Sequence, residues 1–162
     1  MMGVGKSTIG KILSKKLSIS FIDVDKLIES KEKNSINNIF KNKGEHYFRK
    51  IEEKITLDEL KRNNSIISLG GGAFLSKSIR SAVKTSSISF WLDVKIDLLI
   101  SRLKKTKKRP LLYKKNLFET MNKIYLERKK SYSEADFRIK CNLLTPDEIV
   151  MKIFKIYEST RN

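Results

Sequence analysis

The most informative stretch of the chain is Gly3-Val4-Gly5-Lys6-Ser7-Thr8, which stands directly before an amphipathic helical pattern. It reads as the end of the phosphate-binding motif GxxxxGK[ST]. Glycines let backbone N–H groups curl around phosphate oxygens, and the following helix N-terminus adds unpaired N–H groups and partial positive charge. Lys6 supplies a mobile charge for the β- and γ-phosphates, and Ser7 offers a hydroxyl to Mg²⁺. The stretch therefore predicts a nucleotide-phosphate site.

The beginning of the chain departs from this motif. The first glycine of the motif should stand five residues before Gly5, which is one place ahead of Met1. The strand that feeds such a loop, normally central in the sheet, is absent as well. Its neighbours would then face a gap that leaves backbone groups unpaired. We expect a chain start assigned too late or a truncated fragment.

Helical patterns alternate with short apolar strands along the rest of the chain, which is typical of an α/β domain with a mostly parallel sheet. A length of 162 residues favours a single domain, residues 1–162. The expected elements are a helix after the loop, strand 20–23, helices 24–31 and 35–62 with a break near Gly44, strand 65–69, helix 76–84, strand 88–92, helices 95–104 and 117–132, strand 137–140, and a last helix opened by a capping box at Thr145.

The net charge of +17 is the unusual feature of the composition. Such a balance can mark a nucleic-acid-binding protein, but the lysines are spread along the whole chain without interleaved aromatic residues. We interpret them as a solvated coat and expect no nucleic-acid partner. No apolar run approaches the roughly 18 residues of a spanning helix, and the N-terminus lacks the layout of a signal peptide. Cys141 is the single cysteine and cannot form an internal disulfide, which fits a reducing cytoplasm. We also expect a monomer without a membrane partner.

Two carboxylates follow the first visible strand. Asp23 and Asp25 stand at its C-terminal end, where open α/β sheets place their ligands. Residues two apart share a face of a strand, so both side chains could face one site if the strand continues. A helix cap and a solvated charge are the alternative interpretation.

Further short motifs follow in a fixed order, and together with the phosphate loop they resemble the shikimate kinase family from residue 1 to about residue 150. Each motif except the loop is weak by itself, and the ordered set is specific. The motifs are Phe21-Ile22-Asp23-Val24-Asp25, Ile39-Phe40, Gly44-Glu45-x-x-Phe48-Arg49-x-x-Glu52, Gly70-Gly71-Gly72, Arg109-Pro110-Leu111-Leu112, Arg128-x-x-x-Tyr132 and Pro146.

The resemblance implies a P-loop three-layer α/β/α sandwich that uses ATP and Mg²⁺ to phosphorylate the 3-hydroxyl of shikimate. It implies catalytic roles for Lys6, Asp25 and Arg109, and places Mg²⁺ at Ser7 and, through water, at Asp23. The nucleotide would be bound by Gly3, Val4, Gly5, Lys6, Ser7, Thr8, Arg102, Arg109 and Pro146. Shikimate would be bound by Asp25, Arg49, Gly70, Gly71, Gly72 and Arg128.

Physical chemistry supports these assignments. A planar carboxylate is best held by guanidinium forks, which suits Arg49 and Arg128 better than lysine would. Exposed helical charges are the alternative interpretation of both arginines. Four of the eight arginines, at positions 49, 102, 109 and 128, fall on motif positions of this lysine-rich chain. The resemblance also implies that Phe40 and Phe48 are pocket walls and that Glu52 supports an arginine.

The very basic stretch 104–116 is expected to be a lid over the nucleotide, with Arg109 as its phosphate-contacting residue and a solvated loop as the alternative. Three other functions stay open: a different small-molecule kinase such as a gluconate or nucleoside kinase, a catalytically silent ligand-binding domain of the same family, and a charge-driven nucleic-acid-binding module.

Overall fold

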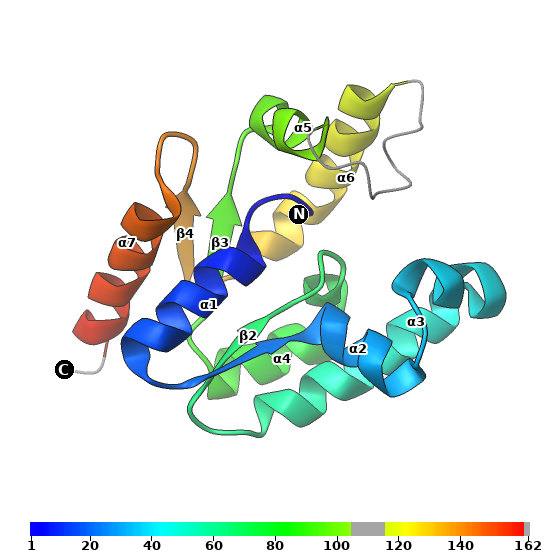
Figure 1. The fold of residues 1–162 in the computed structure, drawn as a ribbon, viewed down its shortest axis with the longest axis horizontal. Coiled ribbons are helices and arrows are strands. Elements are labelled where there is room, and N and C mark those ends of the chain that lie inside the picture. The colour runs from blue at the N-terminus through cyan, green and yellow to red at the C-terminus, as the bar shows by residue number, and fades with distance from the viewer. Residues whose placement is uncertain (105–115, 161–162) are drawn as a thin grey trace. The chain divides into compact units, whose positions relative to one another are not determined.

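The computed structural model describes residues 1–104 and 116–160 (Figure 1). The chain divides into two compact units, one of Gly10–Ile88 and one of Met1–Ile9 with Ser89–Asn162, and each is described by itself. The described elements are, in chain order, α1 (Lys6–Leu17), β1 (Ser20–Asp23), α2 (Val24–Glu32), α3 (Ile36–Leu60), β2 (Ser65–Ser68), the 3₁₀ helix η1 (Ala73–Leu75), α4 (Lys77–Ser86), β3 (Phe90–Asp93), α5 (Ile96–Lys104), α6 (Leu117–Tyr132), β4 (Phe137–Lys140) and α7 (Pro146–Ser159).

The unit of Gly10–Ile88 is built on the parallel pair β1 and β2. Their register runs from Ser20 opposite Ser65 to Asp23 opposite Ser68. Parallel neighbours need a long crossover, and α2 and α3 supply it. Gly10 of α1 lies against Phe21 of β1, because a Cβ at Gly10 would overlap the Phe21 ring. The glycine therefore lets helix and strand approach closely.

The core of this unit lies between α2 and α3, which run side by side in Figure 1. It consists of Val24, Ile28, Ile39, Phe48 and Ile55, whose side chains are buried. Burial of each such side chain contributes about 1.5–3 kcal/mol before the loss of conformational entropy. The positions follow the 3.6-residue period of an amphipathic helix, which is why the sequence pattern predicted both helices.

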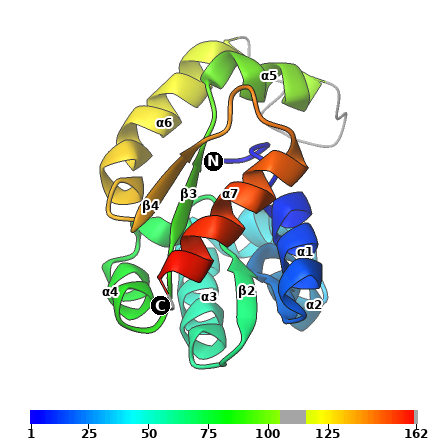
Figure 2. The ribbon, with the colours of Figure 1, turned by 90° about the vertical axis from the view of Figure 1, so that its left-hand side faces the viewer.

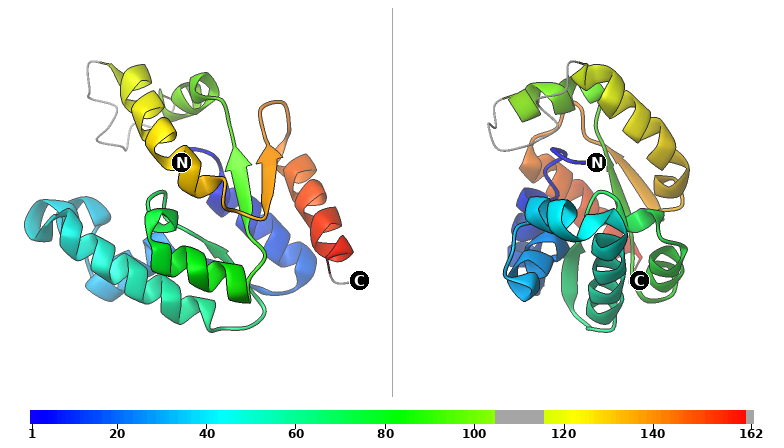
Figure 3. Two further views of the ribbon diagram at one scale, coloured as in Figure 1. Left: turned by 180° about the vertical axis from the view of Figure 1, so that it is seen from behind. Right: turned by 90° about the vertical axis from the view of Figure 1, so that its right-hand side faces the viewer.

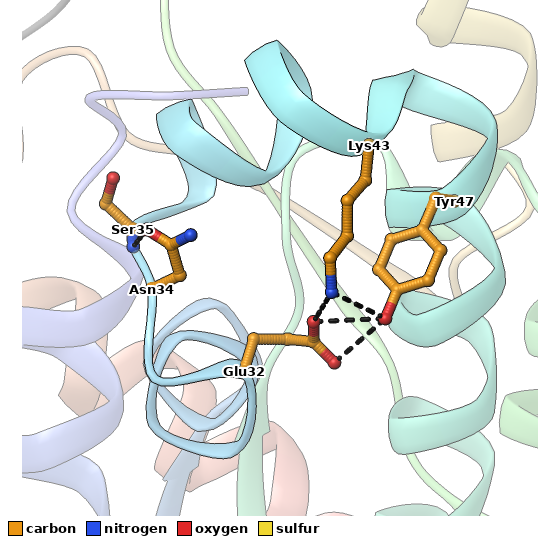
Figure 4. Close-up of polar contacts among 5 residues, drawn as sticks. All are labelled: Glu32, Asn34, Ser35, Lys43 and Tyr47. Carbon is orange, nitrogen blue, oxygen red and sulfur yellow. Dashed lines mark hydrogen bonds and ion pairs between the residues drawn. The ribbon is translucent and has the colours of Figure 1, made fainter.

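A polar cluster ties the end of α2 to α3 (Figure 4). Lys43 Nζ lies 2.9 Å from Oε2 of Glu32 and 3.2 Å from the hydroxyl of Tyr47. The same hydroxyl donates to Glu32, 3.1 Å from its Oε2. Between the two helices Lys33 adopts the left-handed conformation that often ends a helix, with φ 51°. We call Glu32, Lys43 and Tyr47 the α2–α3 clasp.

Helix α3 is broken at Gly44, as the sequence predicted. Gly44 has φ 79° and ψ 168°, a combination that is almost restricted to glycine. The break separates the segment that carries Phe40 and Lys43 from the segment that carries Arg49. Both segments keep the helical hydrogen-bonding pattern on their own side of Gly44.

The second unit is built on the parallel pair β3 and β4, which Figures 2 and 3 show side by side with α7 next to β4. The register runs from Phe90 opposite Phe137 to Asp93 opposite Lys140. The Trp91 ring is buried, and the Arg138 guanidinium lies 4.6 Å from its centroid while pairing with Asp93. Such a cation–π contact stabilises a half-exposed strand pair.

Most predicted elements agree with the structure within two residues. The capping box at Thr145 is confirmed, since its side chain and that of Glu148 bond reciprocally to the backbone. The strand predicted over 88–92 lies at Phe90–Asp93, and η1 was not predicted. The four strands of the described residues form two parallel pairs. Over the ranges described, no helix has the length and apolar character needed to cross a membrane.

Candidate active site

The phosphate-loop residues have the backbone that the motif demands. Gly3 and Gly5 adopt positive φ angles of 75° and 94°, which other residues rarely tolerate. A Cβ at Gly3 would also approach Cδ2 of Leu103 to 3.3 Å. Helix α1 begins at Lys6, so the N–H groups of its first turn lie directly after the loop. The loop is therefore arranged for an anion at a helix N-terminus.

Positive charge is concentrated beside this loop. Lys6 Nζ donates to the carbonyl of Met1 at 3.0 Å, and the Met1 amino group donates to the hydroxyl of Tyr132 at 3.0 Å. Burial, together with the charges of Lys6 and Arg128, lowers the pKa of that amino group to about 4. Lys6 and Arg128, which are far apart in the sequence, therefore both place positive charge near the Met1 amino group. A polyphosphate is the kind of ligand that such a field attracts.

The two aspartates after β1 do not share a strand, in agreement with a strand predicted to end at Asp23 and a helix predicted from residue 24. Asp23 is the last residue of β1 and caps α2, accepting from the backbone N–H of Lys26 at 3.4 Å. The strand ends there because a capped helix begins at the next residue, so Asp25 lies in the first turn of α2. The interpretation of Asp23 as a helix cap is thus correct. The carboxylate of Asp25, in contrast, lies next to Gly70.

The glycines after β2 bring Asp25 together with residues of α3. A Cβ at Gly70 would stand 2.7 Å from Oδ1 of Asp25 and would overlap Oε1 of Glu52. A Cβ at Gly72 would overlap the guanidinium of Arg49. The absence of side chains here lets the backbone approach three charged groups closely. Within this unit the structure therefore gathers Asp25, Arg49 and the glycine run, as the sequence predicted.

Arg49 is held by two carboxylates and two aromatic rings. Nε and Nη2 lie 3.2 and 3.1 Å from Oε1 of Glu45, and Nη1 lies 2.5 Å from Oε2 of Glu52. Its Cζ lies 5.1 and 5.9 Å from the ring centroids of Phe48 and Phe40. Burial disfavours the charge of Arg49, but Glu52 and Glu45 outweigh it and raise the pKa of the guanidinium. Arg49 therefore stays charged and oriented, unlike a solvated helical arginine.

The remaining predicted residues lie in the second unit. Arg128 is half-buried on α6, Arg102 is exposed on α5, and Pro146 is exposed at the first position of α7. Val4 is buried, Ser7 is half-buried and Thr8 is exposed at the start of α1. Arg109 and nearly all of the predicted lid 104–116 lie outside the described residues.

Ser7 and Asp23, the two predicted Mg²⁺ ligands, belong to different units, and each offers an oxygen donor. This ion favours hard oxygen ligands, keeps several waters and takes only one or two protein ligands beside nucleotide phosphates. Ser7 follows the loop directly, and Asp23 stands at the carboxyl end of β1. Across residues 1–104 and 116–160, no three His, Cys, Asp or Glu side chains gather as a metal-ligand group. Each residue by itself is therefore of the ligand type that Mg²⁺ uses beside nucleotide phosphates.

Sequence reasoning missed Glu45 as a partner of Arg49. A usable signal was present, because Glu45 and Glu52 stand four residues before and three residues after Arg49. Side chains at those spacings are neighbours on a helix surface. Glu52 is 2% exposed, so it needs the arginine to remain charged.

Comparison with known proteins gives consistent results over nearly the whole chain. A family model described as shikimate kinase matches residues 2–158. A shikimate kinase of Sulfurihydrogenibium sp. (strain YO3AOP1) is 41% identical over 152 residues, which cover 94% of this chain and 90% of the relative.

Solved structures give the same result. A shikimate kinase from Acinetobacter baumannii, in complex with shikimate, superposes with a TM-score of 0.92 at 29% identity, covering 98% of this chain and 89% of that one. A shikimate kinase from Aquifex aeolicus superposes with a TM-score of 0.83 at 33% identity, covering 99% and 94%. The predicted α/β fold class of P-loop kinases is confirmed by these neighbours.

Proposed function

Because the chain belongs to the shikimate kinase family, as its ordered motifs predicted, we propose that it transfers the γ-phosphoryl group of ATP to the 3-hydroxyl of shikimate. A bond forms between the hydroxyl oxygen and the γ-phosphorus, and the bond from that phosphorus to the β,γ-bridging oxygen breaks. The products are shikimate 3-phosphate and ADP. The proton of the hydroxyl leaves to a carboxylate or to solvent.

One observation supports this acceptor more than any other: the glycine run lies against both an aspartate and an arginine. Gly70 approaches Asp25, and Gly72 approaches Arg49. Shikimate carries hydroxyl groups and a carboxylate on one ring, and these need a hydrogen-bond acceptor and a cationic fork respectively. A gluconate or nucleoside kinase gives no reason for this arginine beside a glycine run.

We assign Asp25 to the attacking hydroxyl and Arg49 to the carboxylate. A carboxylate can accept the hydroxyl proton and orient its oxygen toward phosphorus, which contributes about 10²–10⁴-fold in rate. Arg128 would be a second ligand of the carboxylate, and Gly71 would approach the substrate ring. Both roles follow the family motifs.

Lys6 and the loop N–H groups would hold the transferring phosphate, and Arg102 and Pro146 would bracket the adenine. Arg109 is proposed as a further phosphate ligand from the lid. Ser7 and Asp23 would hold Mg²⁺, which neutralises phosphate charge when bound. Phosphoryl transfer requires little covalent chemistry from the protein, so these residues act by positioning and charge stabilisation.

A coupled assay of ADP release, with MgATP and shikimate, tests the proposal. The wild-type chain should show turnover that depends on shikimate, and Asp25→Asn should lower kcat by at least about 100-fold. Asp58→Asn on α3 is the matched control, because it removes the same charge from an exposed ion pair with Lys61. Its kcat should equal that of the wild type.

The outcomes separate the alternatives. A folded chain that binds ATP yet shows no ADP release with shikimate would reject this acceptor. Release with gluconate or a nucleoside would then identify another kinase, and silence with every acceptor would identify a binding domain. Equal activity of Asp25→Asn and the wild type would reject the assigned role of Asp25 alone.

A further inference from the structure

All three nitrogens of the Arg49 guanidinium are engaged by carboxylates of its own helix. Glu52 takes Nη1, while a single oxygen of Glu45, Oε1, accepts from both Nε and Nη2. The edge formed by Nε and Nη2 is one of the two edges at which a guanidinium binds a planar carboxylate with two parallel bonds. Glu45 therefore occupies a ready-made carboxylate site.

The two glutamates are not equivalent. The Glu52 side chain is 2% exposed, and Oε1 of this residue also lies close enough to Gly70 to overlap a Cβ built there. The Glu45 side chain is 66% exposed, and it uses one oxygen where a fork offers two bonds. Removing Glu52 would leave one edge of the half-buried Arg49 guanidinium without its partner, whereas Glu45 can return to water at little cost. Exposed ion pairs of this kind contribute only about 0–1 kcal/mol.

The position of Glu45 adds to this difference. It follows Gly44 directly, at the break of α3, and so belongs to the first turn after the break. Arg49 stands four residues later, with Phe40 and Phe48 against its guanidinium. The rings and Glu52 fix the plane of the guanidinium, and these contacts do not depend on Glu45.

We propose that Glu45 is an internal competitor, a carboxylate that occupies the Nε–Nη2 edge of Arg49 until the carboxylate of the acceptor displaces it. This inference rests on the proposed function, because it requires Arg49 to bind an acceptor carboxylate. Glu45 is then a specificity-determining residue. It keeps Arg49 paired when no acceptor is bound, and it weakens the binding of every carboxylate that must replace it.

The test compares Glu45→Gln with the wild type, using shikimate and its methyl ester as acceptors. Neutralising the competitor should lower KM for shikimate about 2–5-fold, the factor expected for an exposed ion pair. kcat should not change, because the competitor has left before the chemical step. The methyl ester carries no charge to compete with Glu45, so its KM should be equal in both proteins. Asp58→Asn controls for the loss of one negative charge from α3.

Each outcome has one meaning. A higher KM for shikimate in Glu45→Gln would overturn the proposal, because Glu45 would then be orienting Arg49 for the substrate. Equal decreases in Glu45→Gln and Asp58→Asn would overturn it as well, since they would reflect net charge. An unchanged KM, with normal turnover, would overturn the competitor alone. Absence of any turnover with shikimate in the wild type would overturn the proposed function and the competitor together.

Discussion

Gly72 lies so close to Arg49 that any side chain at position 72 would collide with the guanidinium group. A Cβ there would stand 2.6 Å from Cζ and 2.7 Å from Nη2 of Arg49. The φ angle of Gly72 is −106°, which any residue adopts. Close approach, rather than backbone conformation, is therefore what requires glycine at this position.

Gly72→Ala should impair acceptor binding while leaving the fold intact. The colliding group is the far end of a long side chain, so the methyl group would move the guanidinium more readily than the backbone. A charge-assisted hydrogen bond is worth about 1.5–3 kcal/mol, and its loss should raise KM for shikimate by about tenfold or more. Steady-state kinetics measure this change. The urea midpoint of unfolding should fall as well, because displacing Nη1 takes away the partner of the buried Glu52 carboxylate. A normal KM in the variant would contradict the assigned role of Arg49.

The sequence predicted the parts of this fold that are locally encoded. Gly3 and Gly5 predict the phosphate loop, because such a loop needs residues with positive φ angles and glycine adopts them most readily. Gly44 predicts the break in α3, because glycine can adopt backbone angles that no helix contains, here φ 79° and ψ 168°. Local chemistry also explains why the sequence left two interpretations of Asp23 and Asp25 open. Asp after an apolar run can continue the strand or cap a helix, and only the next residues decide between them.

Contacts between distant residues could not be predicted in this way. Nothing in the pattern around Gly10 shows that Phe21 will pack on it, because the approach of α1 to β1 depends on the whole unit. The pairing of β1 with β2 is equally non-local, since four-residue strands carry little register information. The family resemblance supplied what local reasoning lacked at Arg49, Gly70 and Gly72.

Glu32→Gln should weaken the α2–α3 clasp in a pH-dependent way. The hydrogen bond from Lys43 is the main cause that lowers the pKa of Glu32 below its ordinary value of 4.5. A lowered pKa in the folded state adds stability above the ordinary pKa, and this stability is lost as the pH falls through the lowered value. Wild type should therefore resist urea better than the variant at pH 7, and the difference should vanish well below pH 4.5.

A matched control for this prediction is Glu158→Gln. Glu158 is exposed on α7 and forms no side-chain ion pair with any described residue. Its loss should leave the urea midpoint unchanged from neutral to acidic pH. A Glu32→Gln midpoint that stays equally low at both pH extremes would show that packing, rather than the charge of Glu32, holds the clasp.

Gly44→Ala should destabilise the protein through its backbone. The position has φ 79° and ψ 168°, and a Cβ built there meets no heavy atom within 4 Å. The cost is therefore conformational, about 1–3 kcal/mol for a residue forced into this region. Urea unfolding measures it, with Lys41→Ala, an exposed change in the same helix, as the control expected within about 0.5 kcal/mol of wild type. Increased helicity by circular dichroism without loss of stability would show instead that alanine straightens α3.

Cys141 should be inert in the folded protein. Its side chain is buried, and its thiol donates to the carbonyl of Ile139 at 3.1 Å. Burial raises the pKa of the thiol from 9.0 to about 11, so at pH 8 the thiolate fraction falls by about 100-fold. The thiolate is the reacting species, and burial also blocks access to it.

Since the chain has one cysteine, labelling with an aromatic disulfide measures the reactivity of this residue alone. We expect labelling of the native protein to be at least about 100-fold slower than of the urea-unfolded protein. Comparable rates in the two states would show that the end of β4 opens readily to solvent.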